Sequence, residues 1–461
     1  MAHSAPAAAP RQPEAPPATA SATQPADRET AWPPGRRSWM IAALLALASI
    51  ASQFDRVVLN LTVEPVKGHF GMDDTRFAML QGVAFGIFYT LCSVPIGRLA
   101  DKHRRTGLLG ISLLLFSAFS MASGLARNFT QLFVSRVGVA VGEASVTPTG
   151  LSLLADLFPP VRLGRAVGVF FLSAPFGIGL AYLVGGQLLD GLTAAHVASD
   201  GLPFGLLPWQ ACFLLVSLPG LFLAPVFWLL REPLRRGSGQ DRTLSIREVV
   251  NVVKERRLTL TLMFSGFAMV TLVNFAYNVW MPALFGRVYG WDPAQVGLGF
   301  GLIMIIFGTA GTFFAGVLAD KVAATGKVDA PLRVAAWSFL LCGVFGTIAP
   351  LMPNAWASLA LIAPTMFLSC MPVPCAGTAL QLIVPNRARA QVTAFYIMVI
   401  SLVGIGLGPV IIGFMNDHVF TAPTDIRYSM AIVVGVASPL MWVLLLFALK
   451  PYRKLREAAE S

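Results

Sequence analysis

Apolar residues gather in twelve long runs along the chain, and short polar segments separate them. A helix rises about 1.5 Å per residue, so about 20 consecutive apolar residues are needed to cross the hydrocarbon core of a bilayer. The runs meet this requirement at approximately 38–63, 77–99, 106–126, 129–156, 163–189, 209–230, 257–285, 294–319, 331–350, 355–384, 391–416 and 427–449. The pattern predicts an all-α membrane protein with twelve transmembrane helices.

The composition agrees with a multi-pass membrane protein. Of the 461 residues, 56% are hydrophobic and only 12% are charged. The five cysteines lie inside apolar runs without the spacing of a metal site, and the five histidines lie in tails or loops. The sequence also shows no glycine-rich phosphate loop followed by Lys and Ser/Thr. We therefore expect no enzyme activity, no cofactor, no bound metal and no ATP-driven transport.

The distribution of Lys and Arg orients the predicted spans. If the N-terminus is cytoplasmic, 27 of the 34 basic residues fall on the cytoplasmic side and five on the other, with Arg56 and Arg136 inside spans. This bias follows the positive-inside rule and predicts that both termini are cytoplasmic, in a plasma or inner membrane. The net charge of +11 is explained by topology, and a nucleic-acid partner is not expected.

Polar segments divide the chain into two halves. The stretch 232–256 is the one long internal polar segment and leaves six spans on either side. Residues 1–37 are rich in Pro and Ala and lack the apolar core of a signal peptide, so we expect a disordered tail. The predicted organisation is tail 1–37, lobe 38–231, linker 232–256, lobe 257–450 and tail 451–461.

The two halves repeat short motifs at equivalent places. GRLADK at 97–102 ends the second span and GVLADK at 316–321 ends the eighth. GIGL at 177–180 in the fifth span returns at 404–407 in the eleventh. Long-range repeats in a membrane chain predict a duplicated bundle related by pseudo-two-fold symmetry, with its site between the lobes near mid-membrane.

These motifs resemble signatures of the major facilitator superfamily. GRLADKHRR resembles its loop motif after the second span, and Gly404, Gly408 and Pro409 resemble its helix-bending motif, which the fifth span carries incompletely. The resemblance implies a two-lobe transporter that works by alternating access, with the helix bend at a gate. It also implies a cytoplasmic gate, for which the candidates are Gly97, Asp101, Arg104, Arg105, Asp156 and Arg165. The alternative is that these charges only set the topology.

Four charged residues lie deep inside the predicted spans: Asp55, Arg56, Arg136 and Glu143. A charge at mid-membrane is costly, about 2.5–3.5 kcal/mol on insertion scales, so it faces a partner or a cavity. Asp55, Arg56 and Arg136 are predicted at one depth, which favours an Asp55–Arg136 contact and leaves Arg56 and Glu143 to share. Asp55 and Glu143 are the candidates for proton coupling, and Arg56 and Arg136 for binding an anion. The alternative is a structural network of buried ion pairs.

Asp55-Arg56 together with RVGVAVGEA at 136–144 resembles the spinster branch of the superfamily, as does GIGLAYLVGG in the fifth span. The resemblance implies a sphingolipid or lysophospholipid as substrate.

Three polar residues in the seventh span, Asn274, Tyr277 and Asn278, are candidates for substrate binding, or for hydrogen bonds to another helix. We expect a monomeric, proton-linked transporter. Its expected substrate is an amphipathic anionic lipid, that is, a lipid-like anionic small molecule, and the protein also contacts membrane lipids. The alternatives are a proton-coupled exporter of drugs or organic anions, and a non-transporting receptor or scaffold.

Overall fold

The computed structural model describes residues 32–33, 35–235 and 246–460. Most of the predicted N-terminal tail and part of the predicted linker lie outside these residues. Within the described residues, twelve helical spans are long and apolar enough to cross a membrane, which confirms the predicted number.

The helices of the first lobe are α2 (Gly35–Leu61), α3 (Val63–Phe70), α4 (Asp74–Gln81), α5 (Val83–Lys102), α6 (Arg105–Gly124), α7 (Phe129–Glu143), α8 (Val146–Leu157), α9 (Pro160–Ala198), η1 (Pro203–Gly205) and α10 (Pro208–Leu229). Those that follow are α11 (Ile246–Glu255), α12 (Arg257–Tyr289), α13 (Pro293–Ile303), η2 (Met304–Gly308), α14 (Thr309–Ala323), α15 (Ala330–Ile348), η3 (Ala349–Leu351), α16 (Ala355–Cys370), α17 (Pro372–Ile383), α18 (Asn386–Ile400), η4 (Ser401–Ile405), α19 (Gly406–His418), η5 (Pro423–Asp425) and α20 (Ile426–Glu460).

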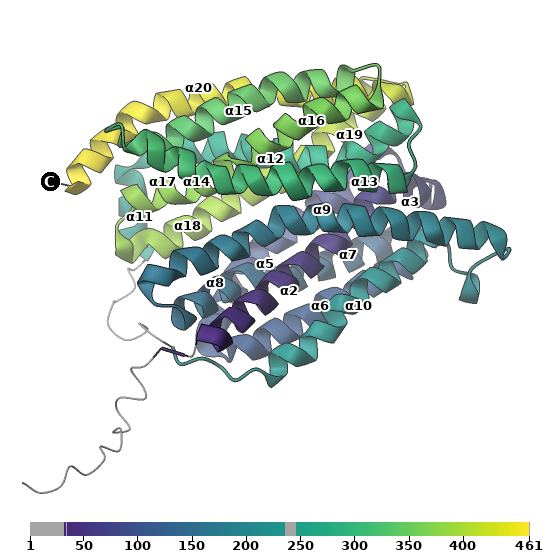
Figure 1. The fold of residues 1–461 in the computed structure, drawn as a ribbon, viewed down its shortest axis with the longest axis horizontal. Coiled ribbons are helices and arrows are strands. Elements are labelled where there is room, and N and C mark those ends of the chain that lie inside the picture. The colour runs from purple at the N-terminus through teal and green to yellow at the C-terminus, as the bar shows by residue number, and fades with distance from the viewer. Residues whose placement is uncertain (1–31, 34, 236–245, 461) are drawn as a thin grey trace, which may run out of the picture.

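The two lobes lie side by side, with α2 to α10 in one and α12 to α20 in the other (Figure 1). The start of α2 and the finish of α20 lie at the same end of the bundle, on the left of Figure 1. We call this the terminal end, and the opposite end, near α3 and α13, the distal end.

Several helices extend beyond the predicted spans. The predicted linker contains a helix, α11, and α20 continues through the predicted C-terminal tail to Glu460. Helix α12 runs to Tyr289 and so includes Arg287, which the sequence placed in a loop. The predicted span 257–285 therefore ended too early to include this charge.

Equivalent spans of the two lobes are broken at mid-length. The fourth span ends its first helix at Glu143 and resumes at Val146, because Pro148 has no amide hydrogen and its ring clashes with the carbonyl of the preceding turn. The tenth span breaks at Met371, where Pro372 opens α17. Two further spans contain a π-helical turn, η2 and η4, a feature frequent at functional sites.

The lobes meet closely at the distal end, through small residues on α9 and α13. A Cβ placed on Gly186 would lie 2.3 Å from the carbonyl oxygen of Pro293, and one on Gly297 would lie 2.3 Å from that of Tyr182. Only residues without a Cβ let the two backbones approach so closely. The packing therefore closes the distal end and leaves room between the lobes toward the terminal end.

Candidate functional site

A cavity of about 680 Å³ lies between the two lobes. Its wall runs from Gly164 and Gln381, near the terminal ends of α9 and α17, to Asn60 and Asn278 in the interior. Helices α2 and α9 line it from one lobe, and α12, α14 and α17 from the other. Its volume is in the usual range for a small-molecule site.

The four buried charges form two ion pairs between α2 and α7, inside the first lobe. Arg136 Nη1 donates to Asp55 Oδ2 at 2.5 Å, which confirms the predicted contact. Arg56 donates to Glu143 Oε2 from Nε at 3.0 Å and from Nη2 at 2.5 Å. The pairs are separate because neighbouring residues on a helix point about 100° apart.

The two arginines differ in their access to the cavity. Among the described residues that line the cavity, Arg56 is the one charged side chain, and its guanidinium lies 4.2 Å from the ring centre of Phe85. Arg136 lies behind it with none of its surface exposed. The prediction that Arg136 contacts an anionic ligand directly therefore does not fit the structure, whereas Arg56 is placed to do so.

The inner limit of the cavity is a group of hydrogen bonds between the lobes. Asn60 Nδ2 donates to the carbonyl oxygen of Asn278 at 3.2 Å, and the Tyr182 hydroxyl donates to the same oxygen. Gln81 Nε2 donates to Asn60 and to the Arg56 carbonyl oxygen, the latter at 3.1 Å. These bonds separate the cavity from the distal end and connect its floor to the backbone of Arg56.

The candidates on the seventh span divide between two faces of α12. Asn274 and Asn278 line the cavity, and Asn274 Nδ2 also donates to the Ser369 carbonyl oxygen at 3.2 Å. Tyr277 is fully buried on another face, where its hydroxyl donates to the carbonyl oxygen of Gly346. The structure thus places Tyr277 away from the cavity.

At the terminal end, Arg105 is the centre of a charged cluster formed by the first lobe and the start of the linker. Its Nη1 lies 2.5 Å from Asp156 Oδ2, and its Nε lies 2.8 Å from Glu232 Oε1. Burial raises the pKa of Glu232, but hydrogen bonds from the Thr106 amide and from Arg105 outweigh it, so this pKa is held below its ordinary value. Glu232 was not predicted as a site residue, because it lies in the polar stretch 232–256, whose pattern indicates only a linker.

The other gate candidates are less involved in contacts between helices. Arg104 Nη2 donates to the carbonyl oxygens of Trp228 and Leu230, Arg165 is exposed, and a Cβ on Gly97 would meet nothing within 4 Å. The side chain of Asp101 lies outside the part of the structure that is described. The described bonds of this region join helices of one lobe.

The helix-bending residues of the eleventh span pack against α12. A Cβ on Gly404 would lie 2.4 Å from Thr271 Cβ, and one on Gly408 would lie 2.6 Å from the Leu272 carbonyl oxygen. Trp280 Nε1 donates to the Pro409 carbonyl oxygen at 2.9 Å. These contacts place the three residues where α19 and α12 lie close together, and their role in bending the helix at a gate stays a prediction.

Twelve spans, two lobes and a central cavity with one cationic residue define a multi-pass membrane transporter. The sequence model described as Major Facilitator Superfamily matches residues 45–402, so the chain belongs to this superfamily, whose members are not enzymes.

The similar proteins include transporters with different printed functions. An MFS-type efflux pump of Mycolicibacterium smegmatis is 24% identical over 401 residues, covering 83% of this chain and 85% of the pump. Protein spinster of Drosophila melanogaster is 23% identical over 408 residues, covering 85% of this chain and 64% of that protein.

A crystal structure of a bacterial homologue of the human lysosomal transporter spinster, inward-facing and unoccupied, has a TM-score of 0.72 at 21% identity. The alignment covers 92% of this chain and 98% of that one. The similarity in sequence to Protein spinster confirms the resemblance to the spinster branch, and at 21% identity the structural match concerns the fold.

Proposed function

We propose that this protein is a secondary transporter of an amphipathic anionic lipid, of the lysophospholipid or sphingoid-phosphate type. The observation that carries the proposal is the position of Arg56, the one charged side chain among the described residues of the cavity wall. A guanidinium presents paired donors that match a phosphate or carboxylate group. Gln53 lines the cavity near it and adds amide donors for the same head group.

The rest of the cavity suits a hydrocarbon tail. Val167 and Phe171 on α9 face the same cavity as Phe313 on α14 and Val373 on α17. Phe171 and Phe313 are 44% and 58% exposed. A hydrocarbon tail bound against these rings would be removed from water together with their apolar surface, which favours binding. An anionic head at Arg56 and a tail along these residues would fill both parts of the cavity.

The direction of opening follows from the charge distribution. The excess of Lys and Arg flanks the spans at the terminal end, which favours this end as cytoplasmic. The cavity reaches toward that end and is closed at the distal end, so the conformation is open to the cytoplasm. Alternating access then requires the two lobes to rock until the distal end opens.

A proton could be linked to the substrate through Arg56. Protonation of Glu143 would remove the charge that Arg56 now pairs with and free its guanidinium for the head group. Protonation of Asp55 would release Arg136 in the same way, inside the lobe. Coupling free energies between linked sites are about 1–3 kcal/mol, a change of roughly fivefold to 150-fold in affinity.

A reconstituted transport assay tests the substrate class. In proteoliposomes we expect saturable uptake of a labelled lysophosphatidate and at least tenfold weaker uptake of the matching uncharged monoacylglycerol. Arg56→Ala should lose saturable uptake, whereas Arg162→Ala, which removes an exposed charge at the terminal end, should keep it. Equal uptake of both lipids, or normal uptake by Arg56→Ala, would refute the proposal.

A second candidate function is export of drugs or organic anions. Four aromatic rings line the cavity, from Phe85, Phe171, Phe275 and Phe313, and flat aromatic substrates would stack on them. The similarity to an efflux pump supports this candidate as well. Competition decides between the two: a lipid transporter is inhibited by phosphate-headed amphiphiles, and an exporter by aromatic cations or anions without a long tail.

A further inference from the structure

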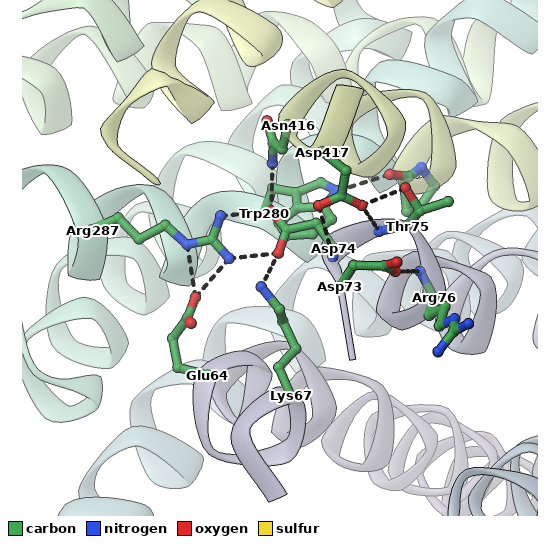
Figure 2. A network of polar contacts seen from close by, with 11 residues as sticks. Glu64, Lys67, Asp73, Asp74, Thr75, Arg76, Trp280, Arg287, Asn416 and Asp417 are labelled. Atoms are coloured by element: carbon green, nitrogen blue, oxygen red, sulfur yellow. Dashed lines mark hydrogen bonds and ion pairs between the residues drawn. The ribbon is translucent and has the colours of Figure 1, made fainter. Parts of the chain in front are cut away.

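A second group of charged residues lies at the distal end, where it joins the two lobes (Figure 2). Lys67 on α3 and Asp74 at the start of α4 belong to the first lobe. Arg287 near the end of α12 and Asp417 near the end of α19 belong to the second, together with Asn416. We call these five residues the distal lock.

Asp74 is the centre of the distal lock. Its carboxylate is 2% exposed and accepts from Arg287 through both oxygens, from Nη1 to Oδ2 at 2.6 Å and from Nη2 to Oδ1 at 2.8 Å. Asn416 Nδ2 donates to Oδ2 at 2.8 Å, and Lys67 donates to Oδ1. A bidentate arginine–carboxylate pair is among the stronger hydrogen-bonded contacts, and here it connects residues 213 apart on opposite lobes.

A second contact between the lobes is made at the N-terminus of α4. Asp417 accepts from the amides of Asp74 at 3.1 Å and Thr75 at 2.6 Å, and from the Thr75 hydroxyl at 2.5 Å. The first amides of a helix have no partner within the helix, so a carboxylate from the other lobe satisfies them. A Cβ on Gly413 would lie 2.7 Å from the Asp74 carbonyl oxygen, so α19 fits tightly against α4 at this point.

The lock can open without leaving a buried acid unpaired. Asp74 would keep Lys67, which belongs to its own lobe. Helix α4 would keep its own N-cap, because Asp73 Oδ1 accepts from the Arg76 amide at 2.7 Å. The charges that lose partners are Arg287 and Asp417, next to the ends of their helices, and the exposed Glu64 on α3, which accepts from Arg287 Nε at 2.8 Å. Water replaces the lost bonds at these positions.

We propose that the distal lock sets the balance between the two end states of the transport cycle, by holding the distal end shut until both the Asp74–Arg287 pair and the Asp417 cap are broken. This role is independent of which substrate the cavity accepts. The contacts of α4 fall into two classes, those within the first lobe and those between the lobes, and only the second class should hold the distal end shut.

Pairs of matched variants distinguish the two classes of contact, because the two variants of each pair remove a contact from the same group of α4. Arg287→Ala and Lys67→Ala each remove a cation from the Asp74 carboxylate, but only Arg287 reaches it from the other lobe. Asp417→Ala and Asp73→Ala each remove a carboxylate from the start of α4, but only Asp417 comes from the other lobe. The Lys67 and Asp73 variants are thus controls for loss of charge, of a hydrogen bond and of a cap.

The measurement is the distance between spin labels on the two lobes at the distal end, by pulsed electron paramagnetic resonance. Gly68→Cys and Val419→Cys place labels on α3 and after α19 at exposed positions. Cys92 and Cys370, the native cysteines that are not buried, are first replaced by Ser. Opening of the distal end appears as a second, longer distance between the two spin labels.

We expect Arg287→Ala and Asp417→Ala to raise the ratio of open to closed protein at least tenfold, Asp73→Ala to change it less than twofold, and Lys67→Ala not to raise it, because Lys67 is the partner that Asp74 keeps in the open state. The proposal is overturned if the inter-lobe variants keep the wild-type distances, or if the controls shift them equally. If Arg287→Ala does not yield folded protein, Arg287→Gln and Asp417→Asn serve with the same criteria. A lower melting temperature without a longer distance also overturns it, because it shows a purely structural role.

Discussion

Charged side chains gather at both ends of the bundle, but the bonds they make differ in which helices they connect. At the terminal end, Arg105 holds Asp156 of its own lobe and Glu232 just after α10, and Asp329 of the second lobe holds Arg333 and Arg453. At the distal end, Asp74 and Asp417 bond across the lobes. The same kinds of residues therefore stabilise each lobe at one end and hold the lobes together at the other.

The difference explains why the cavity opens in one direction. Ion pairs within a lobe survive a rocking motion unchanged, and so do not resist it. Pairs between lobes must break, so they favour the state that keeps them. A charged cluster should hence affect either the stability of a lobe or the conformational balance, according to its connections.

The largest expected effect is on the stability of the folded protein, through the charged cluster at the terminal end. Arg105→Ala removes the buried cation that pairs with both Asp156 and Glu232, and removing one partner of a buried ion pair costs about 3–5 kcal/mol. We expect a clear fall in the melting temperature in detergent, with the distal distances unchanged. Arg104→Ala is the control, because Arg104 is exposed and bonds only carbonyl oxygens in the structure that is described. A conformational shift in Arg105→Ala would contradict the division between the two ends.

Glycine contacts at the distal end should give the opposite result. Gly186→Ala places a methyl group against the Pro293 carbonyl oxygen, and overpacking of this kind costs about 1–3 kcal/mol. Because only the distally closed state contains this contact, we expect the open population to increase while each lobe stays folded. Gly191→Ala on the same helix meets nothing within 4 Å and should behave as wild type. The label pair at Gly68 and Val419 measures both.

A substitution at the buried partner of Arg56 tests the proton link. Glu143→Gln keeps the hydrogen-bonding shape but removes the charge that pairs with Arg56. Uptake of lysophosphatidate by wild type should respond to an imposed pH gradient, and uptake by this variant should not. An equal response in both proteins would remove Glu143 from the proton path, and no response in either would indicate a uniporter.

The smallest expected effect is the pH dependence of the terminal cluster. The pKa of Glu232 is below its ordinary value of 4.5 in the folded protein, so its stabilising contribution is complete above 4.5 and is lost as the pH falls through the folded pKa. The difference in melting temperature between wild type and Glu232→Gln should be largest near neutral pH and shrink toward pH 4. A difference that grows on acidification would show that the contacts of Glu232 favour its protonated form.

The sequence predicted what depends on local pattern. The twelve spans follow from apolar length, and the Asp55–Arg136 pair follows from two charges at equal depth on neighbouring helices. The face that a residue occupies was harder to predict: Asn278 lines the cavity while its neighbour Tyr277 is buried elsewhere. A helix that packs on several sides has no single polar face from which to choose.

The distal lock could not be predicted for a different reason. Asp74 lies in a short polar segment between spans, and Arg287 follows an apolar run, so each looked like an ordinary loop charge that sets topology. Their contact depends on how two lobes close, over a separation of 213 residues. The breaks in the fourth and tenth spans had a visible signal in Pro148 and Pro372, next to residues of the site.

The central claim, that the two ends of the bundle open in alternation, is tested by measuring both ends in one protein. Labels at Gly164→Cys and Gly377→Cys report the terminal end, because both positions line the cavity and a Cβ at either meets nothing within 4 Å. We predict that Arg287→Ala lengthens the distal distance between Gly68→Cys and Val419→Cys and shortens the terminal one in the same fraction of molecules. Distances that lengthen together, or a distal opening with an unchanged terminal distance, would contradict the account.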